Sequence, residues 1–313
     1  MSSLPPLYPS AAIVATALGL QGYRKRSLSL DGAITAWLVG YGHLANPIKV
    51  FGVTMIGMYL IGSRATKVKV DVKAKLEDGP DPLKPSGNRN WIQVLSNSLP
   101  GLIAALTYRF GPASQVGILL AFFSLPHILL DESTIILAAH PLARPLLYTS
   151  LGLNATILAD TLASELGILS TNQPIYLPTL RPVPKGTNGA ISPLGTAVSV
   201  LGGGVMGLIM ALDLLVENPV SRSQLGWVGE LIGVGAGLGL AGSLLDSILG
   251  AFLQPTYFST STNQILTDTS KKSPKDDDVK KIGYGINVLS NSGVNFVCGV
   301  VMSGVGWWYG SKL

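Results

Sequence analysis

The stretch 225–253, LGWVGELIGVGAGLGLAGSLLDSILGAFL, decides the fold class, because it carries only two charged residues, Glu230 and Asp246. A helix needs about 20 predominantly apolar residues to cross the hydrocarbon core of a bilayer. The stretch is long enough, and its glycines are typical of membrane helices, in which small side chains let neighbours pack closely. It therefore predicts a transmembrane helix.

Similar apolar windows recur along the chain. Charged residues make up only 12% of the 313 residues, which is about half the share found in soluble domains. The pattern predicts an all-α fold, a polytopic transmembrane helix bundle of about nine helical segments, forming one integral membrane domain over residues 1–313. The windows are 7–20, 28–45, 47–63, 91–108, 113–130, 145–167, 193–216, 225–253 and 284–309.

Three polar connections, 64–90, 170–192 and 255–283, separate these windows. Much of the formal net charge of +5 comes from basic residues in loops, so we expect these connections at the cytoplasmic face rather than on nucleic acid. The second contains four prolines and is expected to be irregular. The first and second can share a face only if an even number of crossings separates them, yet three windows lie between; the region 127–140 is the candidate that does not cross simply.

Acidic residues inside apolar windows are the first candidates for function, because a charge at membrane depth costs at least ~2.5 kcal/mol. Asp160 and Glu165 lie near the end of the window 145–167. On a helix, Asp160 shares a face with Ser164, and Glu165 shares one with Thr161. Carboxylates and hydroxyls so close together could hold Mg²⁺ through oxygen. The alternative is a helix end at which both charges are hydrated.

Asp246 has apolar residues on both sides and is the stronger candidate. Its alternative role is a hydrogen bond between two helices. Glu230 and Asp213 lie nearer the ends of their windows, where we expect them at the headgroups. Cys298, the single cysteine, excludes an intrachain disulfide and a cysteine zinc cluster.

The segment 185–192, KGTNGAIS, leads from the proline-rich loop into the window 193–216. Gly186 and Gly189 would let the backbone approach a ligand closely. Donors near a helix N-terminus suit a phosphate, although this is no Walker A loop, since the lysine precedes the glycines. An ordinary turn and helix cap is the alternative. The donors are Lys185, Thr187, Asn188 and Ser192.

Asparagines recur every four residues in the window 284–309, at Asn287, Asn291 and Asn295, and this spacing predicts a polar stripe on one helix face. Such amides can bind ligand oxygens or join helices, and both roles stay open. The segment 237–242, GLGLAG, matches GxGxxG, but no strand precedes it, so we expect it to serve helix packing.

Five polar segments, in this order along nearly the whole chain, resemble the motifs of the transmembrane protein 19 family, also known as domain-of-unknown-function family 92. This sequence departs from the family where Ala159 and Leu162 replace frequent Gly and Trp, and where Ser292 replaces an Asn. The segments are GNRNWIQVLSN (87–97), ADTLASELG (159–167), PKGTNGAIS (184–192), LDSILGAFLQ (245–254) and LSNSGVNF (289–296).

The resemblance implies an activity. The plant branch of the family includes the phytyl-phosphate kinase of vitamin E synthesis, which converts an isoprenyl monophosphate to the diphosphate with a nucleoside triphosphate. The family is also distantly similar to dolichol and phytol kinases and to CDP-diacylglycerol synthases, which use CTP. Carried over, the acidic positions that would hold Mg²⁺ are Asp160, Glu165 and Asp246. Those that would cradle or orient the triphosphate are Lys185, Gly186, Thr187, Asn188, Gly189, Ser192, Asn291 and Asn295.

We therefore predict a membrane-embedded kinase, dependent on CTP or another nucleoside triphosphate, that acts on an isoprenyl phosphate. Its tail would lie between helices near Leu238, Leu244 and Val297. The partners expected are this lipid and the membrane lipids, with no nucleic acid. We favour the endoplasmic reticulum over a plastid, and homo-oligomerisation stays open.

Two alternatives stay open as well. Buried acids and glycine-interrupted helices also mark ion-coupled transporters or carriers. The second alternative is a non-catalytic structural membrane protein whose polar residues only join helices.

Overall fold

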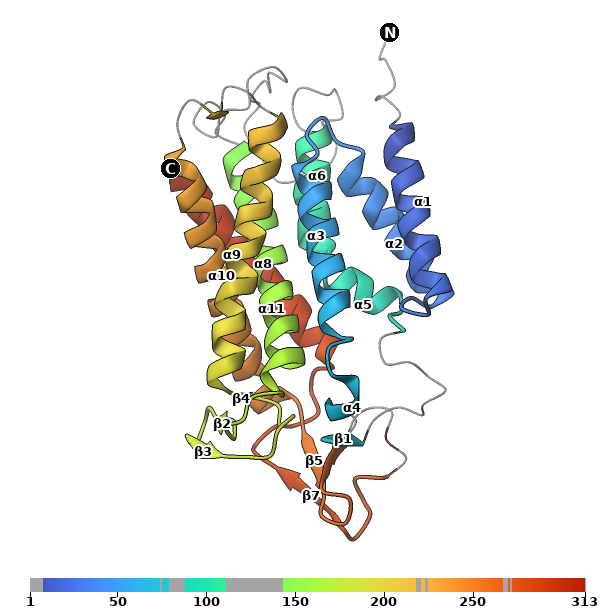
Figure 1. The fold of residues 1–313 in the computed structure, drawn as a ribbon, viewed down its shortest axis with the longest axis vertical. Helices are drawn as coiled ribbons and strands as arrows, with labels where there is room; N and C mark the ends of the chain where they lie inside the picture. Colours follow the sequence, from blue (N-terminus) through green and yellow to red (C-terminus); the bar gives the residue numbers. More distant parts are fainter. Residues whose placement is uncertain are drawn as a thin grey trace.

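The computed structural model of the chain describes residues 8–73, 75–78, 88–110, 143–217, 221–222, 225–266, 270 and 272–312. Its long helices stand side by side in a bundle, and short strands lie at one end (Figure 1). The helices are α1 (Pro9–Arg24), α2 (Leu30–Leu44), α3 (Val50–Ala65), α4 (Val70–Lys73), α5 (Trp91–Ser96), α6 (Leu99–Phe110), α8 (Ala143–Gly167), α9 (Pro193–Glu217), α10 (Gly226–Leu253) and α11 (Asn291–Lys312). The strands are β1 (Glu77–Asp78), β2 (Ile175–Tyr176), β3 (Arg181–Pro182), β4 (Ala190–Ile191), β5 (Thr256–Ser259), β6 (Gln264–Leu266) and β7 (Val279–Ile282).

The described helices coincide with the predicted windows at most positions; the window 113–130 lies outside the described residues. Two windows differ. The window 91–108 is broken into α5 and α6, since α5 ends at Ser96 and Pro100 stands in the first turn of α6, where proline is tolerated. The window 284–309 begins too early, because the backbone N–H of Ile286 donates to the Phe252 carbonyl at 2.9 Å and helix α11 starts only at Asn291.

The helices differ in how well they suit a bilayer. By length and composition, α9 and α10 could each cross a membrane, and α3 is a shorter apolar helix. Helices α8 and α11, with 25 and 22 residues, are long enough to cross a bilayer. They are less apolar than α9 and α10; α8, for example, carries the charged residues Arg144, Asp160 and Glu165. The fold is thus mostly helical, while a count of about nine crossing segments stays a prediction.

Helix α8 lies at the centre of the bundle. It packs against α3, α6, α9, α10 and α11, and most of its residues from Pro145 to Ala159 are buried. A helix that is apolar on all sides belongs in a core. This central position lets its last turns contact several neighbours at once, which matters for the site below.

Helices α9 and α10 pack through glycines. A Cβ added at Gly203 would stand 2.1 Å from the Gly235 carbonyl oxygen, and one at Gly207 would stand 2.1 Å from the Leu231 carbonyl oxygen. Within the GxGxxG segment, Gly239 packs against Gly203, whereas Gly237 faces open space. These contacts agree with the expectation that the segment serves helix packing.

Replacing Gly203 by Ala should therefore destabilise the bundle by about 1–3 kcal/mol, because the new methyl group must push two backbones apart. Gly237→Ala is the matched control. It makes the same chemical change on α10 with no neighbour within 4 Å, so it should be neutral or slightly stabilising. Thermal melting in detergent compares the two. Equal melting temperatures would show that the close approach of α9 and α10 is not there in solution.

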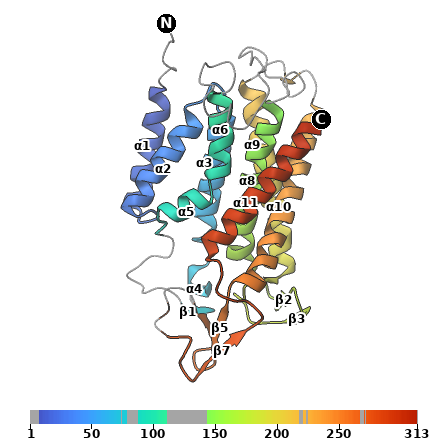
Figure 2. The same cartoon turned by 180° about the vertical axis from the view of Figure 1, so that it is seen from behind.

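The three polar connections meet at one end of the bundle (Figures 1 and 2). Strand β1 of the first pairs with β6 of the third, in a sheet of order β1-β6-β5-β7. The Tyr176 hydroxyl, from the second, donates to the Ala251 carbonyl at 2.9 Å and accepts from the Tyr284 N–H at 2.9 Å. The expectation of an irregular second connection is wrong in part, since it contains the small sheet β3-β2-β4.

The first two connections lie at the same end of the bundle, while the region 127–140, expected not to cross simply, lies outside the described residues. Helix α6 runs away from this end and α8 returns to it (Figure 1), so the two connections lie together. That this end faces the cytoplasm stays a prediction. The third connection is pinned by Asp278, which accepts from Lys272, Ser261 and Ser259; these hydrogen bonds hold the pKa of Asp278 well below its ordinary value.

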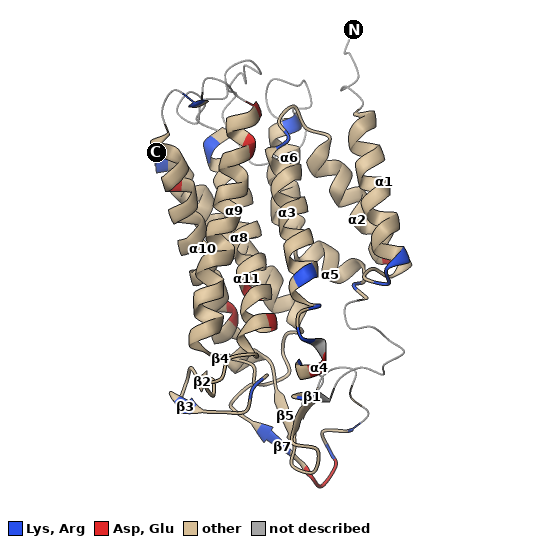
Figure 3. Ribbon diagram, viewed as in Figure 1, with Lys and Arg blue, Asp and Glu red and all other residues tan. Residues whose placement is uncertain are grey.

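Charged residues mark the two ends of the bundle, and the middle is almost free of them (Figure 3). The exceptions include acidic residues toward the strand-bearing end, where Asp160, Glu165 and Asp246 lie on α8 and α10. Acids at this depth need a partner or a use. The structure separates these three into two different environments.

Candidate functional site

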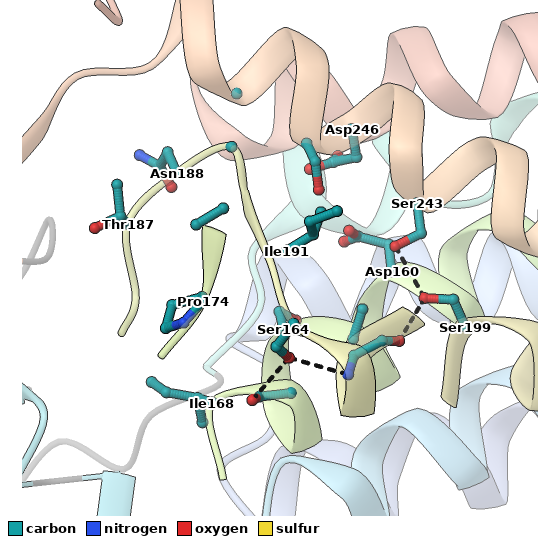
Figure 4. Close-up of a pocket in the computed structure, with 18 of the residues that line it drawn as sticks. Asp160, Ser164, Ile168, Pro174, Thr187, Asn188, Ile191, Ser199, Ser243 and Asp246 are labelled. Atoms are coloured by element: carbon teal, nitrogen blue, oxygen red, sulfur yellow. Dashed lines mark hydrogen bonds between the residues drawn. The ribbon is translucent and has the colours of Figure 1, made fainter. Parts of the chain in front are cut away.

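A cavity of about 260 Å³ lies where the polar connections meet the bundle, between α8, α9, α10 and the segment before α9 (Figure 4). The whole segment 185–192 lines it, together with Asp160, Asp246 and Asn291. Segments that are far apart in sequence thus converge on one hollow. This is the arrangement that a shared binding site requires.

Two of the predicted site residues do not line this cavity. Glu165 stands five positions after Asp160, so it leaves α8 on another face. There its Oε2 pairs with the Lys73 ammonium at 2.5 Å, and the same ammonium donates to the Ala65 carbonyl at 3.2 Å. The structure therefore gives Glu165 a different neighbourhood from that of the predicted Mg²⁺ ligands, and it ties α8 to the first connection. Asn295 is the second predicted site residue that does not line the cavity; it lies on α11 behind Asp246.

Asn295 connects α11 to Asp246. Its amide lies 3.2 Å from the Asn97 Oδ1, and when its nitrogen faces α10 it donates to the Asp246 Oδ2, also at 3.2 Å. The Cys298 thiol stands 3.9 Å from the same oxygen. Asp246 is thus held by neutral groups. Asn287 precedes the start of α11, so the predicted stripe of three asparagines is wrong at its first position.

Asp160 and Asp246 lie on neighbouring helices and border the same cavity (Figure 4). Both are partly buried, and their charges interact with one another. In the described part of the chain, neither carboxylate has an ion-pair partner. Two acids that face one hollow without a cation repel each other. A bound cation would offset that repulsion.

The cavity is a fit for Mg²⁺ with a phosphate ligand. Within the described ranges, no group of three or more His, Cys, Asp or Glu residues could hold a metal alone. Mg²⁺, however, is usually bound by one or two carboxylates plus water and substrate phosphates. Asp160 and Asp246 are such a pair, and Ser164 adds a hydroxyl at the cavity wall. The donor set therefore suits a metal that arrives with its phosphate.

Several side chains of the segment 185–192 hold the loop in place. The Thr187 hydroxyl donates to the Pro184 carbonyl at 2.7 Å. Asn188 donates its backbone N–H to Thr256 and its amide to the Pro255 carbonyl. These bonds agree with the turn that was the alternative reading, and they leave the side chains of Thr187 and Asn188 less free for phosphate.

Ser192 is the helix cap of the alternative reading. Its hydroxyl accepts from the Gly195 N–H at 3.1 Å and donates to the Gly167 carbonyl at 3.2 Å. Gly189 has a φ of +80°, and a Cβ there would stand 2.3 Å from the Ala251 Cβ. Only glycine suits both demands, so this position presses the loop onto α10.

The positive side of the cavity consists of Lys185 and the first turn of α9. The Lys185 ammonium donates to the Ser170 carbonyl, which uses one of its three donors. Gly195 and Thr196 of the first turn of α9 also line the cavity, and a helix N-terminus carries partial positive charge. The cavity therefore has an acidic wall on α8 and α10 and a basic wall on the loop and α9.

Sequence reasoning missed several hydroxyls in this site. Ser199 of α9 donates to the Ser243 hydroxyl of α10 at 3.1 Å, and both line the cavity. Ser243 stands one helical turn before Asp246, so the spacing i, i+3 was the available signal. No comparable signal marks Ser199, because it depends on how α9 and α10 pack.

Replacing Glu165 by Gln tests its separation from the site. We expect a stability loss of about 1–3 kcal/mol, because the Lys73 side chain is only 12% exposed and loses its carboxylate partner, and little change in any activity of the cavity. Asp160→Asn, five residues earlier on the same helix, should lower that activity by about 100-fold or more. Turnover and melting of the two purified variants are the measurements. An equal loss of turnover in the two variants would show that Glu165 belongs to the functional site.

Comparisons with known proteins follow the same motifs. A family described as "Integral membrane protein DUF92" matches residues 13–303. The chain is 32% identical over 291 residues to "Protein PGR" of Arabidopsis thaliana, covering 92% of this chain and 90% of that protein. It is 26% identical over 256 residues to an uncharacterized membrane protein of Methanocaldococcus jannaschii, covering 81% of this chain and 86% of that protein. No solved structure matches.

Proposed function

Since the chain belongs to the DUF92 family of integral membrane proteins, we propose that it is a membrane-embedded kinase that transfers phosphate from CTP or another nucleoside triphosphate to an isoprenyl monophosphate. One observation carries the proposal. A single cavity joins Asp160 and Asp246, two acids with no ion-pair partner among the described residues, to a lysine and the start of α9. A metal–triphosphate has the complementary distribution of charge.

Phosphoryl transfer requires little covalent chemistry from the protein itself. An oxygen of the lipid phosphate attacks the γ-phosphorus, the bond from that phosphorus to the β,γ-bridging oxygen breaks, and the nucleoside diphosphate leaves. Catalysis of this kind consists of positioning and of stabilising charge. When bound, Mg²⁺ would neutralise part of the triphosphate charge, with Asp160 and Asp246 as its protein ligands. Lys185 and the first turn of α9 would bind phosphate oxygens.

The remaining residues position this site. Gly189 fixes the loop against α10, Ser192 fixes the start of α9, and Asn295 orients the Asp246 carboxylate from behind. Asn291 lines the cavity from the start of α11 and is the candidate for a contact with the nucleotide. The cavity lies at the end of the bundle with the polar connections, where a soluble nucleotide can reach it.

Nucleotide binding tests the proposal before turnover is measured. Purified protein should bind a non-hydrolysable CTP or ATP analogue, and binding should require Mg²⁺. Asp160→Asn should remove the Mg²⁺ dependence, because the metal loses a carboxylate ligand. If no nucleoside triphosphate analogue binds to the folded wild-type protein, the kinase proposal fails.

An ion-coupled carrier is the second candidate, and the break between α5 and α6 favours it. Asn97 lies at this break and contacts Asn295 next to Asp246, and broken helices beside buried acids are typical of carrier sites. Uptake into proteoliposomes that depends on an ion gradient, without any nucleotide, would support the carrier.

A location in the endoplasmic reticulum is part of the kinase proposal, whereas the integral membrane character follows from the family.

A further inference from the structure

A second cavity, of about 100 Å³, lies on another face of α8, between α1, α2, α3 and α5. Most of its wall is aliphatic, and glycines of three helices make room for it: Gly19, Gly40 and Gly62. A Cβ at Gly40 would meet only the Ala15 Cβ, at 3.7 Å, and one at Gly62 would meet the Thr161 side chain at 3.5 Å. The space therefore results from small side chains and not from backbones in close contact.

One part of this cavity is polar. Arg89, Gln93 and Asn97 line it from the segment that begins α5. The Arg89 backbone is fixed, since its N–H donates to the Ser27 carbonyl at 3.1 Å and its carbonyl accepts from the Ser29 N–H at 3.1 Å. The wall thus places a cationic side chain against apolar helices in a defined position.

The Arg89 guanidinium has no ion-pair partner within the described ranges. Glu165 interacts with it only at longer range and is paired with Lys73. Burial lowers the pKa of Arg89, yet a guanidinium remains protonated in proteins. A partly buried charge without a partner is costly, so the cavity suits an anion, and phosphate suits the planar fork of arginine best.

We propose that the second cavity binds the phosphate-bearing end of a single-chain lipid, with Arg89 on the phosphate and the first carbons of the chain among α1, α2 and α3. Charge complementarity at one end and an apolar wall at the other both select such an amphiphile over free phosphate or a fully apolar molecule.

The catalytic meaning of this lipid site rests on the proposed function, since the lipid would bind next to the nucleotide cavity. The two cavities share a wall. Asn97 lines the second cavity and contacts Asn295, and Asn295 contacts Asp246 of the first. Thr161 of the second cavity likewise follows Asp160 of the first on α8. That the tail lies near Leu238, Leu244 and Val297 during the reaction stays a prediction.

Binding of tritiated geranylgeranyl monophosphate to purified protein, without nucleotide, tests the proposal. Arg89→Gln should weaken binding about tenfold or more, the loss of one charge-assisted contact. Arg24→Gln, which removes an exposed arginine from the end of α1, should leave it unchanged. Geranylgeraniol, which lacks the phosphate, should bind weakly and equally to the wild type and Arg89→Gln. Inorganic phosphate alone should not displace the lipid.

A second pair of variants tests the apolar wall. Ala36 lines the cavity, so Ala36→Leu should fill it and weaken binding of the lipid. Ala17→Leu adds the same bulk at an exposed position of α1 outside the cavity and should not. Unchanged binding in Ala36→Leu, or in folded Arg89→Gln, overturns the proposal, as does full displacement by inorganic phosphate. Because nucleotide is absent, lipid binding that survives in Asp246→Asn separates this proposal from the kinase proposal.

Discussion

Asp246→Asn should leave the protein folded and lower phosphoryl transfer by about 100- to 1,000-fold, the usual effect of removing one preorganised charge from a site. Asn is nearly isosteric with Asp, so the contact with Asn295 can persist. The change removes the negative charge that a Mg²⁺ ligand requires. Turnover and thermal melting of the purified variant are the measurements.

A matched control is available in Asp213, another acid in an apolar helix. It stands near the far end of α9, beside Glu217, and does not line the cavity. Asp213→Asn should keep full turnover. If Asp246 served only to join α10 and α11, its replacement by Asn would be neutral or mildly stabilising, with activity retained, and most of the proposed mechanism would be lost.

Lys185→Met should produce the second large effect, a loss of about 10- to 100-fold in kcat/KM for the nucleotide, because an ammonium acts on phosphate as a point charge. Met keeps much of the length and apolar stem of the side chain. Lys275, an exposed lysine of the third connection, supplies the control, and Lys275→Met should behave as the wild type.

The structure also allows a structural role for Lys185, since its ammonium donates to the Ser170 carbonyl. Melting separates the two roles. Loss of a loop contact alone would lower the melting temperature and leave the nucleotide KM unchanged. A raised nucleotide KM with unchanged melting is the result expected of a phosphate contact.

The helices could largely be predicted from the sequence, because apolar windows of sufficient length allow little besides helix in a bilayer. The predicted helix boundaries are wrong where local hydrogen bonding, and not hydropathy, decides where a helix starts or ends. Asn90 and Gln93 form a capping box that starts α5. The break after Ser96 falls at the uncharged polar residues 96–98, which a window defined by the absence of charge does not register. The residues before Asn291 look apolar, yet they pair with the end of α10.

The candidate site could be predicted only where the spacing of residues within one helix places their side chains on the same face. Asp160 and Ser164 share a face at any helical register, and both line the cavity. Glu165 was assigned to the same site because sequence distance hides Lys73, which lies in another connection. Arg89 lies in the quoted segment 87–97, but the sequence did not mark it as a binding residue, since its role depends on the space left between α1, α2 and α3. The parallel pairing of β1 with β6 was equally hidden, because it joins the first and third connections.

The most direct measurement is transfer of a labelled γ-phosphate from CTP or ATP to geranylgeranyl monophosphate, with purified protein and Mg²⁺. The wild type should form the labelled diphosphate and one nucleoside diphosphate per product. An Asp160→Asn, Asp246→Asn double variant with unchanged melting should form none. Failure of the folded wild-type protein to label the lipid with either nucleotide, or equal labelling by the double variant, would contradict the assignment of this cavity to phosphoryl transfer.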